Sequence, residues 1–269
     1  MRRIFNHAGF SLIEMIIVIA ITGIVGSMVA LFLRVPLESY VAQDRRARLT
    51  DTADTALRRM GRDIRLALPN SVRVTSAGSV VYLEFLATRS GGRYRAQGGG
   101  DILDFTAADD SFDVLGPAIE MRAGDSIAVY NLGIPGADAW AGETLADYIG
   151  VAGDVNTIAI ADKKFPLASP GNRFQVVEGP VSYVCDPGAG TLTRYWGYAP
   201  AAAQPTAFAA ATPRALLANR VSAPVSAPCS FDYQPGVTER GGLVSMTLSL
   251  SLAGETIRLH ANTQVGNQP

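Results

Sequence analysis

The sequence of 269 residues predicts an α+β fold, in which one long N-terminal helix precedes a head made largely of antiparallel β-sheet. Three observations lead to this prediction. Residues 10–33 are apolar with Glu14 as the only charge, and residues 49–68 repeat apolar side chains at steps of three and four. Beyond Pro69, apolar and polar residues alternate with a period of two within short segments. These patterns are typical of a membrane-length helix, a helix with one buried face, and half-buried strands, in that order.

The apolar run at residues 10–33 is long enough to cross a bilayer, which takes ~20 residues of helix. A secretory signal peptide has a shorter apolar core followed by an A-x-A-like site, and no such site follows closely here. A lipoprotein signal needs an early cysteine, whereas the first one is Cys185. An ordinary signal anchor stays open as an alternative. Arg2 and Arg3 precede the run, so the positive-inside tendency keeps them cytoplasmic and places the chain beyond Arg34 outside the inner membrane.

The six residues Gly-Phe-Ser-Leu-Ile-Glu at positions 9–14 resemble the type IV prepilin signature. The resemblance implies that prepilin peptidase cuts between Gly9 and Phe10 and methylates Phe10, and that Glu14 stays in the membrane helix and acts in assembly. It implies a pilin-like α+β fold without cofactor, catalytic residue or metal, and hence no enzyme. The expected organisation is a leader (1–9), a transmembrane half-helix (10–33), a periplasmic half-helix (34–68) and a β-rich head (69–269). The protein would be single-pass in the inner membrane with its C-terminal head in the periplasm, and after assembly it would lie in a pilus or pseudopilus.

Four further segments carry a finer resemblance. Residues 58–71 look like the end of the long helix in J-type minor pseudopilins, and more like that of O-type biogenesis proteins of the mannose-sensitive haemagglutinin (MSHA) pilus; residues 179–185, 192–198 and 240–244 strengthen the second likeness. It implies a minor pilin that helps to initiate or modulate pilus biogenesis. The alternatives are a J-type minor pseudopilin of a type II secretion system and a tip adhesin. The implied partners are prepilin peptidase, other major and minor pilins, the inner-membrane assembly platform and membrane lipid.

The second half of the helix is predicted from spacing alone. Its buried face should consist of Leu49, Ala53, Ala56, Leu57, Met60, Ile64 and Leu68. Pro36 should bend or loosen the helix, and Pro69 should end it. Residues 38–68 carry seven Arg and five acids, a charge of +2, whereas residues 69–269 carry 13 basic and 18 acidic residues, a charge of −5. No basic surface suggests nucleic acid. The arginines of the helix are either a solvated face or partners for the acidic heads of neighbouring subunits.

Strands are predicted at residues 80–86, 127–130, 173–177 and 243–252, the last of which alternates strictly between apolar and hydroxyl side chains. Ala253 and Gly254 should turn the chain into a hairpin with residues 255–260. We expect the apolar face of this hairpin to cover the second half of the helix, with its hydroxyl face in solvent. Glycine- and alanine-rich stretches at residues 89–101 and 199–213 are expected to be loops.

Cys185 and Cys229 make an even count in an oxidising compartment, which favours one disulfide over two buried thiols. The disulfide should hold residues 186–228 to the sheet. His260 is expected to be structural. Two weaker interpretations stay open: Ca²⁺ on five aspartates between residues 101 and 113, against a solvated turn, and sugar stacking by the aromatics at 195–198 with Trp140, against core packing.

Overall fold

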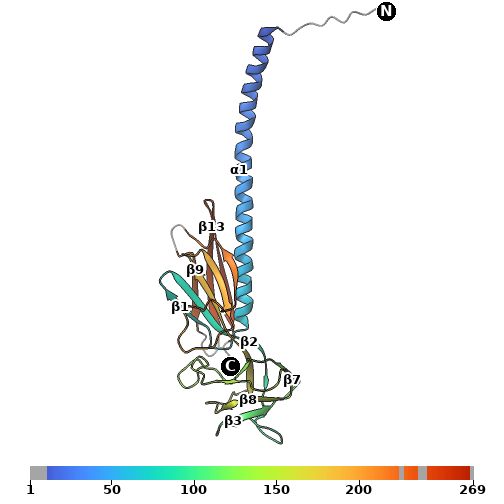
Figure 1. Cartoon of the computed structure of the whole chain (residues 1–269), viewed down its shortest axis with the longest axis vertical. Coiled ribbons are helices and arrows are strands. Elements are labelled where there is room, and N and C mark those ends of the chain that lie inside the picture. Colours follow the sequence, from blue (N-terminus) through green and yellow to red (C-terminus); the bar gives the residue numbers. More distant parts are fainter. Residues whose placement is uncertain (1–10, 224–226, 236–240, 267–269) are drawn as a thin grey trace, which may run out of the picture. The chain divides into compact units, whose positions relative to one another are not determined.

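The computed structural model describes residues 11–223, 227–235 and 241–266. The chain divides into two compact units, Met1–Arg48 and Leu49–Pro269. One helix, α1 (Leu12–Arg65), begins in the first unit and ends in the second, and all fourteen strands of the described residues belong to the second unit. The α+β architecture predicted from the sequence is therefore present, with an apolar helix followed by an antiparallel β head (Figure 1).

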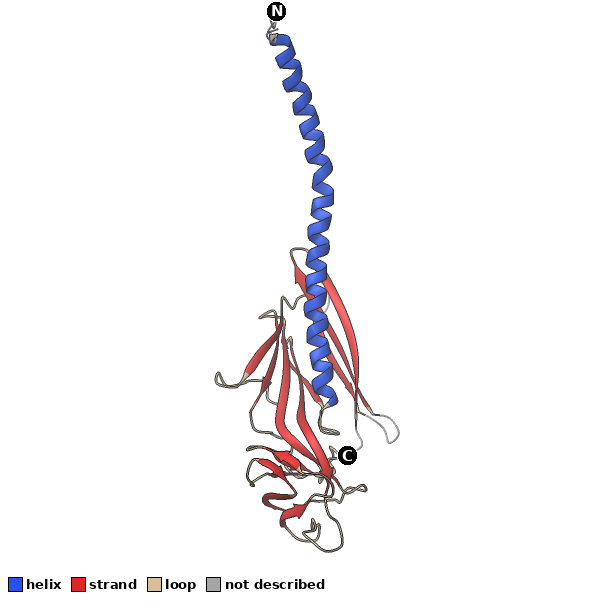
Figure 2. Cartoon of the chain, turned by 90° about the vertical axis from the view of Figure 1, so that its right-hand side faces the viewer, coloured by secondary structure: helices blue, strands red, loops and turns tan. Residues whose placement is uncertain are grey.

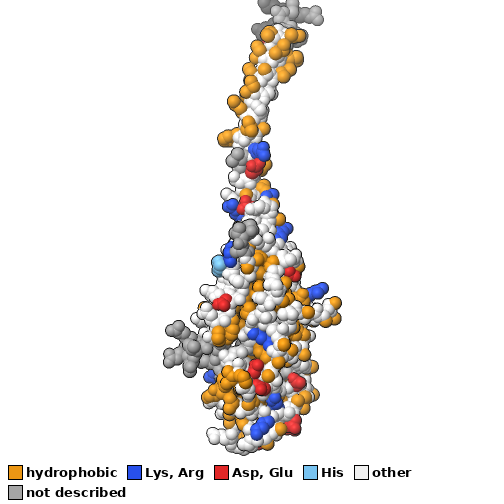
Figure 3. All heavy atoms as spheres, turned by 90° about the vertical axis from the view of Figure 1, so that its left-hand side faces the viewer, with side chains coloured by type: hydrophobic (Ala, Val, Ile, Leu, Met, Phe, Trp, Pro, Cys, Tyr) orange, Lys and Arg blue, Asp and Glu red, His pale blue; other side chains and the backbone are white. Residues whose placement is uncertain are grey.

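In the first unit the apolar stretch of α1 has no cover from the rest of the described chain. Its large hydrophobic side chains between residues 12 and 33 are 50% to 81% exposed. On the face drawn in Figure 3, hydrophobic side chains cover this stretch, and the charged side chains visible on the helix lie further along it. The stretch is long and apolar enough to cross a bilayer. Pro36 lies inside α1, which continues through it.

In the second unit, the C-terminal part of α1 buries the face predicted by its spacing. The buried side chains of the helix include Leu49, Ala53, Ala56, Leu57, Met60 and Ile64. The helix ends at Arg65, three residues earlier than its expected end at Leu68. The amides of Leu66 and Ala67 bond back three residues, and the amide of Leu68 donates to the carbonyl of Leu86 at 2.8 Å. The apolar spacing extends beyond the helix because Leu68 is buried as well, although its backbone is bonded to a strand and no longer to the helix.

The larger of the two main sheets has the order β1-β2-β9-β10-β11, formed by Arg73–Ala77, Val80–Arg93, Arg173–Asp186, Thr191–Trp196 and Arg214–Asn219. On one side of β9 the sheet is extended by β5 (Ser126–Ala128), which also pairs with β6 (Leu145–Asp147). The second sheet has the order β12-β13-β14, formed by Cys229–Gln234, Gly242–Leu252 and Glu255–Val265. Two small sheets pair β3 (Asp109–Asp113) with β8 (Thr157–Lys163), and β4 (Ile119–Met121) with β7 (Gly153–Val155).

Both main sheets share one core with the C-terminal part of α1 (Figure 2). The larger sheet contributes Leu83, Phe85, Val181, Tyr183 and Leu192, and the β12-β13-β14 sheet contributes Phe231, Val244, Met246, Leu248 and Leu250. The apolar face of the predicted hairpin thus covers the helix as expected. Ala253 and Gly254 both have positive φ, 48° and 87°, as a two-residue hairpin turn requires.

The hydroxyl face of the hairpin is less open than predicted. Thr247 and Ser249 are buried, with 8% and 1% of their surface exposed. β13 is the central strand of its sheet, and on this face Thr247 Oγ1 shares a hydrogen bond with Nδ1 of its cross-strand neighbour His260 at 2.8 Å. The backbone of Ser249 is also paired: its amide donates to the carbonyl of Pro228, and its carbonyl accepts from the Ser222 amide. Val221 also forms a bridge with Leu250. The alternation of the sequence therefore identified the core face correctly but missed the burial of Thr247 and Ser249 on the other face.

A second core is formed mainly by the segment between β2 and β9, together with the first residues of β9. It includes the buried aromatic side chains of Tyr94, Phe112, Phe165 and Phe174. Figure 1 shows β3, β7 and β8 gathered at one end of the head, where they form this lobe. The expected loop at residues 89–101 begins as strand, because β2 continues to Arg93. A Cβ on Gly92 would lie 2.7 Å from Ile119 Cδ1, so glycine here permits close packing rather than marking a loop.

Candidate functional site: the apolar helix and the polar networks of the head

The first turn of α1 places the glutamate of the apolar stretch near the positive end of the helix. The Glu14 amide donates to Ser11 Oγ at 3.3 Å, and the Met15 amide donates to the Ser11 carbonyl at 3.2 Å. Ser11 is thus the N-cap, and a carboxylate in the following turn interacts favourably with the helix dipole. Among the described residues, no ion pair includes Glu14. Gly9 and Phe10, the expected cleavage and methylation residues, lie outside the described residues.

Small residues form a ridge along the same apolar stretch. A Cβ on Gly23 or Gly26 would meet nothing within 4 Å, so neither glycine is needed for packing inside the described chain. Together with Ser27 and Ala30 they give two small-xxx-small pairs, the spacing that lets membrane helices approach closely. The hydroxyl of Ser27 donates to the Ile24 carbonyl at 2.8 Å. That bond leaves the hydroxyl satisfied in an apolar medium, so the surface is suited to lipid or to another helix.

In the head, Cys185 and Cys229 are joined by a disulfide, and both residues are buried. Their Cα atoms lie 6.5 Å apart. Cys185 belongs to β9 and Cys229 to β12, so the bond connects the two main sheets beside the helix. The expected role was to hold the 186–228 segment to one sheet. Because each cysteine sits in a different sheet, the bond instead fixes one sheet to the other.

Asp63 connects α1 to the larger sheet through two hydrogen bonds. Tyr183 Oη donates to Asp63 Oδ2 at 2.7 Å, and Arg194 Nε donates to the same oxygen at 2.8 Å. Burial raises the pKa of the Tyr183 phenol, and the charge of Asp63 raises it further. The phenol therefore stays protonated and remains a donor at physiological pH. This contact orients the helix on β9 and β10 and is structural in character.

Glu84 is a fully buried carboxylate on β2 with a neutralising partner. Arg73 lies 2.7 Å from Glu84 Oε2, and Tyr198 Oη donates to Glu84 Oε1 at 2.7 Å. Burial raises the pKa of Glu84, although the bonds from Tyr198 and Arg73 act in the opposite direction. Arg73 also stacks on the Trp140 ring at 3.6 Å and donates to the carbonyl of Ala202 at 2.7 Å. This network therefore holds the 199–213 loop against the sheet.

The aromatic side chains considered for sugar stacking pack within the head. Trp140 is buried and its Nε1–H donates to the Ser71 carbonyl at 2.9 Å. Tyr195 stacks on Phe208 with ring centroids 4.3 Å apart, and Tyr198 meets the same ring edge-on at 5.3 Å. Tyr195 and Tyr198 are half-buried, and both are engaged in ring contacts with Phe208.

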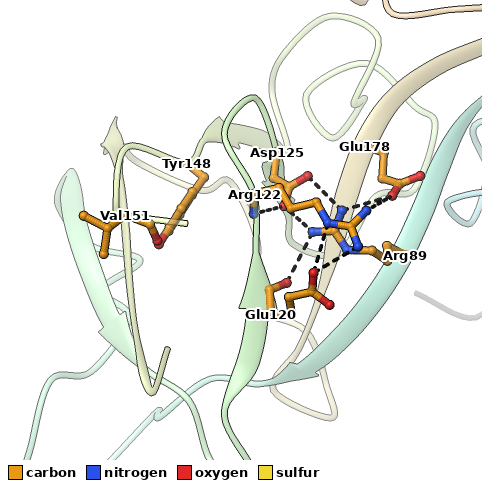
Figure 4. A network of polar contacts seen from close by, with 7 residues as sticks. All are labelled: Arg89, Glu120, Arg122, Asp125, Tyr148, Val151 and Glu178. Atoms are coloured by element: carbon orange, nitrogen blue, oxygen red, sulfur yellow. Dashed lines mark hydrogen bonds and ion pairs between the residues drawn. The ribbon is translucent and has the colours of Figure 1, made fainter. Parts of the chain in front are cut away.

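A further charged network joins β2, β9 and the lobe (Figure 4). Arg89 contacts Asp125 through both terminal nitrogens and donates to Glu178 at 3.0 Å. Burial lowers the pKa of Arg89, but the bonds to Asp125 and Glu178 outweigh it and raise the pKa overall. Arg122 donates its amide to Asp125 at 2.7 Å and pairs with Glu120 at 2.9 Å. No sequence pattern signals this network, since its members are ordinary charged residues far apart along the chain.

The aspartates considered for Ca²⁺ are engaged with the chain itself. Asp104 accepts the amide and hydroxyl of Thr106, and these bonds lower its pKa. Asp113 accepts from Thr157, Asp101 and Arg95, which lowers its pKa in the same way, the bond from Thr157 most. Within residues 11–223, 227–235 and 241–266, no group of His, Cys, Asp and Glu has the arrangement of a metal site.

The comparison with known protein families concerns the N-terminal stretch of the chain. Residues 4–30 match the prokaryotic N-terminal methylation motif. The match covers the expected cleavage site, Glu14 and the small-residue ridge, and supports a protein of type IV pilin or pseudopilin type. Together with the apolar helix, it fits a membrane-anchored structural subunit that is a substrate of prepilin peptidase. No curated protein and no solved structure gives a significant match to the chain.

Proposed function

We propose that the chain is a minor pilin, a structural subunit that helps to initiate or modulate assembly of an MSHA-type pilus. The methylation motif at residues 4–30 supports the general class. The resemblance of residues 58–71, 179–185, 192–198 and 240–244 to O-type biogenesis proteins supports the subtype. The observation that carries the proposal is the placement of Glu14, a lone carboxylate in the first turn of a helix whose apolar side chains are exposed all round.

The physical reason is the cost of this carboxylate in lipid. An ionised carboxylate costs ~2.5–3.5 kcal/mol at the bilayer centre, and less near the edge. In the proposed assembly, the N-terminal amine of an adjacent subunit, freed at Phe10 by cleavage after Gly9, meets Glu14 as the helices pack. The ridge of Gly23 and Gly26 brings the two helices close enough. Glu14 therefore selects the register of the helix in the bundle and leaves the folding of the head unaffected.

In this proposal the head faces the periplasm before assembly. Arg2 and Arg3 hold the leader on the cytoplasmic side, so the chain beyond the membrane stretch emerges on the opposite side. The Cys185–Cys229 bond is consistent with that placement, because disulfides persist in the oxidising periplasm. The further partners are other major and minor pilins and the inner-membrane assembly platform.

A J-type minor pseudopilin of a type II secretion system shares the motif and the helix, so it is the alternative that the same observations allow. The neighbouring genes discriminate between the two: other prepilins with an assembly ATPase indicate a pilus, and secretin-linked secretion genes indicate a pseudopilus. A tip adhesin receives less support, because Trp140 is buried and the half-buried Tyr195 and Tyr198 both contact Phe208.

The test replaces Glu14 and a matched carboxylate on the same helix. Glu14→Ala is expected to leave the protein inserted, cleaved and stable, but to reduce its cross-linking to partner prepilins and its incorporation into the fibre. Glu38→Ala is the control, because Glu38 is exposed and pairs with Arg34 at 2.7 Å within the chain; it should assemble normally. Normal incorporation of Glu14→Ala, or loss of head folding without an assembly defect, would contradict the proposal.

A further inference from the structure

An open groove runs between α1 and β14 within the head. It is lined on the helix side by Leu57, Arg58, Gly61, Arg62 and Arg65, and on the strand side by residues 259–263. Gly61 permits a close approach of the two elements, since a Cβ there would lie 2.9 Å from Thr263 Oγ1. Leu57 and the half-buried Leu259 and Ala261 give the groove apolar surface. We call this the α1/β14 groove.

The strand that forms one wall of the groove is an edge strand. All eleven residues of β14 pair with β13, and no other strand of the described chain pairs with β14. In an antiparallel pair, alternate residues direct their N–H and C=O groups away from the partner. The outer edge of β14 therefore presents a row of backbone donors and acceptors, which is a template for one more extended segment.

The helix wall of the groove is positively charged. Arg58 is paired with Asp54 at 2.6 Å. Arg62 and Arg65 have no such partner among the residues that the structure describes, and both are exposed. His260, on the strand wall, shares a hydrogen bond with Thr247 Oγ1 at 2.8 Å. Two guanidinium groups thus lie beside an open strand edge. Among the described residues that line the groove, the one acid is Asp54, which is already paired with Arg58.

We propose that the α1/β14 groove receives an extended acidic segment of a neighbouring fibre subunit, which adds to β14 as a fourth strand and pairs its carboxylates with Arg62 and Arg65. The proposal rests on the proposed function, because it requires that the chain enter an assembly. Three residues of helix rise about 4.5 Å, whereas same-side residues of a strand are about 6.8 Å apart. The long side chains of Arg62 and Arg65 can span that difference. Two acids separated by one residue in the added segment could therefore each pair with one of these arginines.

The test measures binding of a defined peptide to the full chain in detergent micelles. The probe is a fluorescent peptide as long as β14, in which Glu alternates with Val and Thr, and fluorescence anisotropy reports its affinity. Replacing each Glu of the peptide by Lys should weaken binding about tenfold or more, because the carboxylate–arginine pairs are lost. Arg62→Glu with Arg65→Glu should weaken the acidic peptide equally and favour the Lys peptide.

The matched control is a double charge reversal elsewhere on the head. Arg214 and Arg220 are both exposed and lie at and just beyond the two ends of β11, the edge of the other main sheet. Arg214→Glu with Arg220→Glu should leave the affinity of the acidic peptide unchanged. Equal weakening by the two double variants would overturn the assignment to the α1/β14 groove, since only overall charge would then be at work.

A second measurement tests strand addition itself. N-methylation of alternate peptide residues should weaken binding about tenfold, because it removes the backbone donors of the added strand. Bound peptide should also slow amide hydrogen exchange along β14. Unchanged affinity of the methylated peptide, or unchanged exchange, would overturn the proposal. So would displacement of the peptide by phosphatidylglycerol added to the micelle, which would assign the arginines to anionic headgroups.

The two proposals fail separately. If the peptide does not bind while Glu14→Ala still blocks incorporation, the α1/β14 groove is excluded and the pilin function stands. If Glu14→Ala assembles normally, the proposed function fails whatever the peptide does, and the groove proposal falls with it.

Discussion

The two stretches of α1, residues 12–33 and 49–65, have the same secondary structure but opposite relations to the rest of the chain. The first exposes apolar side chains on every side, whereas the second buries one stripe and exposes charged residues on the other faces. An apolar helix without cover needs lipid or another helix as its partner, and an amphipathic helix finds its partner in its own sheet. The first stretch therefore needs a partner outside the described chain, whereas the buried stripe of the second stretch packs within the head.

The largest expected difference between the two stretches is in the free energy of unfolding of the head. Ile64→Ala removes a fully buried side chain from the core, so it should destabilise the head by about 2–5 kcal/mol. Ile17→Ala is the matched change in the exposed stretch and should leave head stability unchanged. Denaturant unfolding of the full chain in detergent, followed by near-UV circular dichroism of the head, measures both. Equal losses of head stability in the two variants would contradict the proposed difference between the two stretches of α1.

The disulfide lies within the second compact unit, Leu49–Pro269. Cys185→Ser should lower the stability of the head by at most about 4 kcal/mol, the chain-entropy limit for a loop of this size. Insertion and cleavage of the leader should continue, because they depend on the N-terminal stretch. Non-reducing peptide mapping of membrane-extracted protein should recover one linked pair, Cys185 with Cys229. Two free thiols in this protein would contradict the pairing.

Two glycines of α1, Gly61 and Gly23, test the same difference between the two stretches of the helix. Gly61→Leu places a bulky side chain where a Cβ alone already lies 2.9 Å from Thr263 Oγ1, so it should destabilise the head by about 1–3 kcal/mol. Gly23→Leu meets no atom of the chain and should leave the head intact. It should instead reduce cross-linking to partner prepilins, because the helices can no longer approach closely. If Gly23→Leu assembles normally, the small-residue ridge has no role in packing.

The smallest effect concerns the buried carboxylate of Glu84. Its pKa in the folded state is raised, chiefly by burial, so its contribution favours the folded state at low pH and is lost as pH rises through the folded pKa. Glu84→Gln keeps the shape and removes this titration. The unfolding free energy of the native protein, relative to the variant, should fall as pH rises above the ordinary glutamate range. Parallel pH profiles of the two proteins would contradict this interpretation of Glu84.

The sequence predicted the elements whose residues repeat with a regular period. The buried face of α1 follows a step of three and four, and the hairpin of β13 and β14 follows strict alternation with a two-residue turn, so both were predicted correctly. The strand predicted at residues 127–130 is present as β5 (Ser126–Ala128), but β4 and β7 of the second core were not predicted, because they have only three residues each, too few for a period to show. The glycines at the end of β2 were assigned to a loop, although tight packing explains them.

The residues of the candidate site also differ in whether the sequence alone reveals them. The motif around Glu14 is local in sequence, so its residues alone were enough to recognise it. The contacts of Glu84 with Tyr198 and of Arg89 with Glu178 join residues 114 and 89 positions apart. Pairings of that kind depend on the fold and leave no mark in the spacing of the residues. The α1/β14 groove likewise has no sequence signature, because it arises where a helix and an edge strand come together.

The central claim, that the N-terminal stretch is processed and used for assembly, is tested most directly by the intact mass of membrane-extracted protein. In a host with prepilin peptidase, the mature chain should begin at Phe10 and carry one additional methyl group. Gly9→Val should block cleavage and retain residues 1–9. An unmodified chain that starts at Met1 in the peptidase-positive host would contradict the account.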